Sequence, residues 1–146
     1  MRIYLDACSL QRPLDNKSQI RVALEAEAVL GVLALCEAGD LELLSSEVLV
    51  FEVERTPQLS RREYGREVLA KARAFISLND SIVERARIFT TAGVKPLDAL
   101  HLASAEDAQA DYLCTCDDRF LKKARNLPNL NLKVVSPLEL AEEFEP

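Results

Sequence analysis

Short apolar runs alternate with longer amphipathic stretches along this chain, which is the pattern of strands separated by helices. The first apolar run, residues 2–5, has the length of a strand and runs directly into Asp6. Residues 16–37 carry two apolar stripes at helical spacing, which predicts a long helix buried on much of its circumference. Gly39 ends that helix, and residues 41–44 then predict a second strand.

Capping and helix-breaking residues mark the elements that follow. Ser45 or Ser46 is a suitable N-cap for the next helix, Asp80 caps a later one, and Pro96 suits a first helical turn. The remaining expected elements are helices over 47–55 and 60–75, a short strand over 75–78, helices over 81–91 and 96–107, a strand over 111–115, a helix over 118–125, a strand over 132–135 and a helix over 137–144.

This order of elements predicts an α/β fold with a central, mostly parallel sheet between two helical layers. The length, 146 residues, is that of one ordinary domain, and no repeat, low-complexity segment or linker divides it. We therefore expect a single domain over 1–146. No apolar stretch reaches 18 residues, and Asp6 interrupts the first apolar run too early for a signal peptide. A cytoplasmic protein without membrane association is expected.

Composition and charge narrow the classes of function. Eighteen basic and 24 acidic residues give a formal charge of −6, which disfavours a protein that coats nucleic acid non-specifically. Tryptophan is absent and Phe and Tyr are few, so an aromatic base-stacking platform is also disfavoured. Four cysteines without a CxxC pair, together with a single histidine, do not match the common zinc sites. Reduced structural thiols are expected, with a redox or zinc role as the alternative.

Acidic residues stand where apolar elements end or begin. Ligands of parallel sheets bind outside the carboxyl ends of the strands. Asp6 follows the first predicted strand, and Asp117 follows the strand over 111–115. Glu52 lies in an otherwise apolar helical turn, where a buried carboxylate needs a partner or a cavity. Asp98 lies in the first turn of its helix, where the helix dipole alone also explains a carboxylate.

These four acids would form a self-repulsive cluster unless protons or cations neutralise it. Because the candidate ligands are all carboxylates, hard cations such as Mg²⁺ or Mn²⁺ are favoured. The chemistry that such a cluster implies is metal-assisted hydrolysis of a phosphodiester.

The sequence resembles the PIN domain (PilT N-terminus) nucleases, in particular the toxin-like members typified by VapC. The resemblance spans essentially the whole chain and is carried by residues 3–6, 46–52, 96–105 and 113–120. It implies a three-layer α/β/α domain that cleaves RNA with Mg²⁺ or Mn²⁺. It also implies a cognate antitoxin as partner, and the family often forms homodimers.

Matched to the family's pattern, four residues correspond to the acids of the metal site: Asp6, Glu52, Asp98 and Asp117. Thr115 corresponds to the family's hydroxyl residue before the last acid, and Asp118 is a supporting or surface candidate. Many members carry a small polar residue where this chain has Cys8, so the role of Cys8 stays open. For His101, a hydrogen-bonded core histidine is the favoured interpretation over approach to the site.

Basic residues cluster beside these acids. Residues 55–73 carry a local charge of +4, and residues 119–125 form a second basic group. The candidates for RNA phosphate contacts are Arg55, Arg62, Arg66 and Arg119. A solvated helix face explains the first group equally well, and the helix dipole explains the second. The alternative to an enzyme is a catalytically silent PIN-like module that binds RNA or protein.

Overall fold

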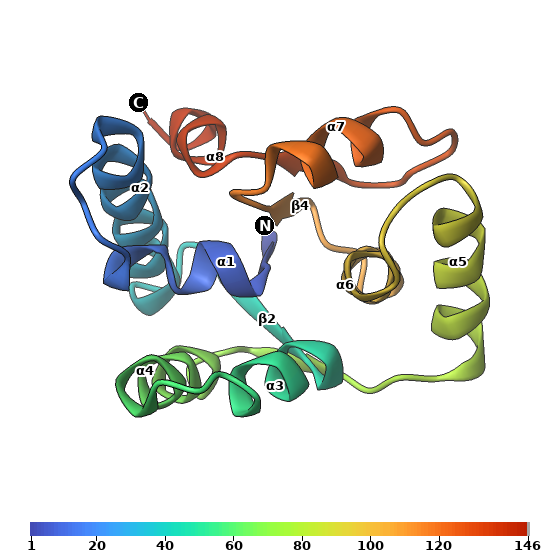
Figure 1. Ribbon diagram of the computed structural model, residues 1–146, viewed down its shortest axis with the longest axis horizontal. Helices are drawn as coiled ribbons and strands as arrows, with labels where there is room; N and C mark the ends of the chain where they lie inside the picture. The colour runs from blue at the N-terminus through green and yellow to red at the C-terminus, as the bar shows by residue number, and fades with distance from the viewer. Residues whose placement is uncertain (146) are drawn as a thin grey trace.

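The computed structural model describes residues 1–145 and shows a five-stranded sheet with helices on both faces (Figure 1). The strands are β1 (Arg2–Leu5), β2 (Glu42–Ser46), β3 (Ala74–Ile76), β4 (Tyr112–Cys114) and β5 (Lys133–Val135). The helices are α1 (Ala7–Leu10), the 3₁₀ turn η1 (Arg12–Leu14), α2 (Ile20–Glu37), α3 (Glu47–Glu54), α4 (Leu59–Leu69), α5 (Asp80–Thr91), α6 (Pro96–Asp107), α7 (Asp118–Arg125) and α8 (Pro137–Glu143).

The sheet has the strand order β3-β2-β1-β4-β5, and every pair of neighbours is parallel. Strand β1 therefore lies at the centre, with Ile3 paired to Leu43 on one side and to Tyr112 on the other. Because all strands run in one direction, their carboxyl ends meet at one edge of the sheet. That edge carries Asp6, which directly follows β1.

Alternate residues of the strands supply two hydrophobic cores, one on each face of the sheet. Ile3 and Leu5 face the core that α2 and α8 cover, whereas Tyr4 faces the core that α5 and α6 cover. Figure 1 shows these two helical layers on opposite sides of the sheet. The predicted three-layer α/β/α architecture is confirmed. Within the described part of the chain, no helix combines the length and apolar character that crossing a membrane requires.

The observed boundaries differ from the predicted ones where side chains or the sheet capture the backbone. Helix α2 begins at Ile20 rather than at residue 16, because the Asn16 side chain accepts a hydrogen bond from the Ser18 amide and holds a turn. Helix α4 ends at Leu69 rather than at residue 75. The chain beyond it joins the sheet, where the Arg73 amide donates to the Leu43 carbonyl.

Two further differences concern helix N-termini. The N-cap of α5 is Asn79 rather than Asp80, since the Asn79 side chain accepts from the Ile82 amide at 2.9 Å. The short helix α1 was not expected; Asp6 caps it through the Ser9 amide. Ser46 caps α3 and Pro96 is the first residue of α6, both as expected.

Candidate active site

Asp6 is a buried carboxylate at the end of the central strand. Only 4% of the residue is exposed. Its Oδ1 accepts hydrogen bonds from the Ser9 amide and from the Cys8 thiol, both at 3.1 Å. Burial raises the pKa of Asp6, and hydrogen bonds from Thr115, Cys8 and Ser9 offset only part of that rise. The fold thus holds the Asp6 carboxylate in a fixed position, and burial makes its ionised form less favourable.

Asp98 lies in the first turn of α6, half-buried. Burial, followed by the negative charge of Asp6, raises the pKa of Asp98 to about 6. The charges of Asp117 and Glu52 raise it further. The charges of Asp6, Asp117 and Glu52 therefore all act on Asp98, although the four acids come from four separate segments of the chain.

Asp117 is exposed and also has a structural role. Its Oδ1 caps α7 by accepting from the amides of Arg119 and Phe120, at 2.9 and 3.2 Å. The hydroxyl of Thr115, a residue buried at 1% exposure, accepts from the Asp117 amide at 3.1 Å. Thr115 thus contacts the backbone of Asp117 and lowers the pKa of Asp6, which links the two acids.

Glu52 lies on α3 with its side chain 27% exposed, and its carboxylate is bound to Nε2 of His101. His101 is buried on α6, and its Nδ1 lies 2.6 Å from the Tyr4 hydroxyl. That hydroxyl lies 2.7 Å from Oγ of Ser46, the N-cap residue of α3. His101 is a hydrogen-bonded core residue, as favoured from the sequence, but it also reaches the candidate site, because it is the partner of the partly exposed Glu52.

Asp118 is turned away from this cluster. Its side chain is 69% exposed and forms a bidentate ion pair with Arg21, at 2.7 and 2.8 Å. That pair lowers the pKa of Asp118.

Arg21 also lies 3.5 Å from Glu25, a residue of which 1% is exposed, and Arg12 holds the same carboxylate at 2.9 Å. The burial of Glu25 and its ion pair with Arg12 were not expected from the sequence, because a glutamate within a helix is usually exposed.

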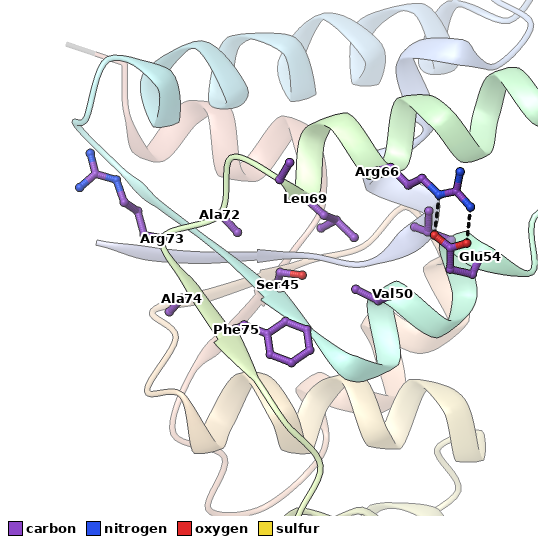
Figure 2. A pocket seen from close by; sticks show the side chains of 11 residues that line it. Ser45, Val50, Glu54, Arg66, Leu69, Ala72, Arg73, Ala74 and Phe75 are labelled. Carbon is purple, nitrogen blue, oxygen red and sulfur yellow. Dashed lines mark hydrogen bonds and ion pairs between the residues drawn. The ribbon is translucent and has the colours of Figure 1, made fainter.

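The arginines predicted to contact RNA differ in whether a carboxylate already pairs with them. Arg66 forms a bidentate pair with Glu54, at 2.6 and 2.5 Å, beside an apolar groove of about 430 Å³ (Figure 2). Arg62 donates to the Thr56 carbonyl at 3.2 Å. Arg55 lies over the Phe51 ring, 4.9 Å from its centroid. Among residues 1–145, no carboxylate lies within ion-pair distance of Arg55 or Arg119.

Tyr4 and Ser46 also lie near these acids. The sequence indicated no site role for Tyr4, and Ser46 was expected only as a helix cap. Tyr4 is fully buried in a strand, yet it carries a hydroxyl, and a buried hydroxyl needs a partner. That requirement was the available signal. Its partner could not be identified, because Ser46 and His101 are 42 and 97 residues away along the chain.

The chemistry of these side chains suits a hard divalent cation, although they do not form a closed binding site. Within residues 1–145, no three His, Cys, Asp or Glu side chains are already grouped as a metal-binding set. The neighbouring donors are carboxylate oxygens, and the charges of Asp6, Asp117 and Glu52 add to the effect of burial in raising the pKa of Asp98. Mg²⁺ binds through one or two carboxylates and keeps several waters, so it does not require a closed cage. Asp6, Asp98, Asp117 and Glu52 are the residues that could hold it.

Comparison with known proteins concerns the family and the fold. The family model of the PIN domain matches residues 3–126. A search of the curated proteins finds no match. The structure is similar to a chain of VapBC2 from Rickettsia felis bound to a DNA fragment from their promoter, with a TM-score of 0.58 at 14% identity, covering 93% of this chain and 98% of that one. It is also similar to PAE2754 from Pyrobaculum aerophilum, with a TM-score of 0.56 at 15% identity, covering 98% and 88%. The chain belongs to the PIN domain family.

Proposed function

We propose that this protein is a metal-dependent endoribonuclease that acts as the toxin of a toxin–antitoxin pair. The observation that carries the proposal is the position of Asp98, half-buried in the first turn of α6, where the charges of Asp6, Asp117 and Glu52 from three other segments act on it. Natural folds seldom keep such repulsion without a function. Membership of the PIN family supports nuclease activity, and the similarity to a chain of a VapBC complex supports an antitoxin partner.

The four acids have distinct parts in the proposed reaction. When bound, Mg²⁺ or Mn²⁺ polarises the phosphodiester and lowers the pKa of a water molecule. Asp6 is fixed by its hydrogen bonds from Ser9 and Cys8, so it offers a preorganised oxygen ligand. Asp98 and Asp117 complete the negative cluster, and Glu52 stands at its side with one oxygen held by His101. Glu52 would bring its other oxygen to the metal, and there it would orient the attacking water or take its proton.

RNA phosphates would lie against the cationic side chains that border this edge. Arg119 lies in the first turn of α7, directly after Asp117, and Arg55 follows α3, which carries Glu52. Because neither is paired with a carboxylate within residues 1–145, both can meet a phosphate without first breaking an ion pair. Arg62 and Arg66 remain candidates, although Arg66 would have to leave Glu54.

The proposal is tested by combining Mn²⁺ titration calorimetry with cleavage of a mixed RNA substrate. The parent protein should bind Mn²⁺ and cleave RNA only with Mn²⁺ or Mg²⁺ present. Asp6→Asn and Asp98→Asn should lose cleavage while keeping the parent's circular dichroism. Glu84→Gln, an acid-to-amide change in an exposed pair with Arg87 on α5, is the matched control and should keep full activity. Cleavage by both site variants would contradict the proposal. If the parent cleaves no RNA in any condition, with or without metal, a silent binding module is favoured instead.

A further inference from the structure

A continuous line of hydrogen bonds runs from the first turn of α3 through Tyr4 of the central strand to the Glu52 carboxylate. It begins at the Leu49 amide, which donates to Oγ of Ser46 at 3.0 Å. It continues through the Tyr4 hydroxyl to His101 and ends at Glu52. Ser46, Tyr4 and His101 are all at least 99% buried, so no bulk water competes for these groups.

The proton positions along this line follow from counting donors and acceptors. Each hydroxyl has one proton, and a neutral imidazole has one N–H and one bare nitrogen. Ser46 already accepts from Leu49, so its own proton can go to the Tyr4 oxygen. Tyr4 then donates to Nδ1 of His101, which leaves the N–H on Nε2, facing the carboxylate of Glu52. In this direction every buried proton has an acceptor.

The opposite direction satisfies fewer groups. If Tyr4 donated to Ser46, Nδ1 of His101 would have to carry a proton. The Ser46 proton would then have no acceptor, since within residues 1–145 Ser46 Oγ contacts only Leu49 and Tyr4. A buried unsatisfied donor costs about 1–3 kcal/mol. A neutral ring with its proton on Nδ1 would also turn a bare Nε2 toward the carboxylate.

We propose that Tyr4 fixes His101 in the Nε2–H tautomer, and that His101 in turn holds one oxygen of Glu52, which makes both positioning residues of the carboxylate site. Glu52 has three side-chain torsions and is partly exposed, so without this contact it would sample several rotamers. With it, one carboxylate oxygen is held in place, and the positions that the second oxygen can take are restricted. The importance of this orientation for RNA cleavage rests on the function proposed above.

The first test measures the tautomer directly. His101 is the only histidine in the chain, so its two ring nitrogens give an unambiguous signal in long-range ¹H–¹⁵N correlation spectra. The parent protein near pH 7.5 should show a protonated Nε2 and an unprotonated Nδ1. A protonated Nδ1, either in the other tautomer or in the imidazolium, would overturn the proposal. In Tyr4→Phe, the fixed tautomer should be replaced by exchange between forms. An unchanged single tautomer in that variant would also contradict the role of Tyr4.

The second test measures what the line of bonds does for metal binding. Loss of a residue that orients a metal ligand lowers metal affinity about 10- to 100-fold. Tyr4→Phe and His101→Asn should therefore weaken Mn²⁺ binding by at least about tenfold. His101→Gln should recover part of that loss, because its amide can place an N–H near the position of Nε2. Ser104→Ala is the control: Ser104 is buried on the same helix, and its Oγ has no hydrogen-bond partner within residues 1–145.

These results separate the inference from the proposed function. Parent-like Mn²⁺ affinity in both Tyr4→Phe and His101→Asn would overturn the positioning role even if the protein is a ribonuclease. Equal losses in His101→Gln, His101→Asn and Ser104→Ala would indicate a general packing defect and would overturn it as well. If the parent binds Mn²⁺ but cleaves no RNA, the proposed function fails. The tautomer and the affinity ratios then still decide the inference.

Discussion

Replacing Asp98 by asparagine should stabilise the metal-free protein at neutral pH. The pKa of Asp98 is raised from 3.8 to about 6 by burial and by the charges of Asp6, Asp117 and Glu52. The folded protein therefore binds the Asp98 proton more tightly than the unfolded chain does. Stability contributed by this group is complete below pH 4 and falls as the pH rises toward 6. Above pH 6 the whole cost of ionisation is present.

The magnitude follows from the same shift. About two pKa units at about 1.4 kcal/mol each set an upper bound near 3 kcal/mol. Since the side chain is partly open to solvent, about 1–2 kcal/mol is the expected gain. For a chain of this length, that corresponds to a melting temperature higher by about 3–8 °C. An isosteric amide keeps the shape and removes only the charge, so other causes of a gain are small.

Thermal and urea unfolding of the parent and Asp98→Asn at pH 4, 5, 6 and 7.5, with chelator present, measure this difference. The two proteins should be nearly equal at pH 4, and the variant should be the more stable one at pH 7.5. Saturating Mn²⁺ should reverse the order, because a ligand bound at 100 times its dissociation constant adds about 2.7 kcal/mol to the parent alone. A variant that is less stable than the parent at pH 7.5 without metal would refute the reasoning. A difference that does not vary with pH would also refute it.

Three further outcomes are expected. A strong reductant should leave the melting temperature and activity nearly unchanged, because all four thiols are free; a drop in either would indicate a required disulfide. Arg55→Gln and Arg119→Gln should each flatten the salt dependence of RNA binding by about one unit, measured by fluorescence anisotropy in an inactive background. Arg66→Gln should have a smaller effect, since Glu54 already neutralises that side chain, and equal slopes would contradict this ranking. Arg12→Ala should cost about 3 kcal/mol in urea unfolding, because it leaves the buried Glu25 with only a long contact to Arg21; a cost below about 1 kcal/mol would mean that Arg21 compensates.

The sequence alone determined the elements, the parallel sheet and the placement of two acids. Apolar periodicity and capping residues act over a few neighbouring positions, so strands and helices can be read locally. A parallel sheet then places the carboxyl ends of its strands at one edge, which brought Asp6 and Asp117 together in the prediction. Boundaries failed where distant backbone intervened, as at the end of α4, whose continuation is captured by Leu43 of β2.

Only the tertiary structure decided which charges are free and which are already engaged. Glu52 meets His101 across 49 residues of chain, and Asp118 meets Arg21 across 97. No local pattern encodes such pairs, because burial and the distance between charges depend on how separate helices pack against the sheet. The same packing that raises the pKa of Asp98 also neutralises Arg66 and buries Glu25. The residue types of the candidate site were therefore visible in the sequence, whereas their electrostatic state exists only once the helices have been brought to the sheet.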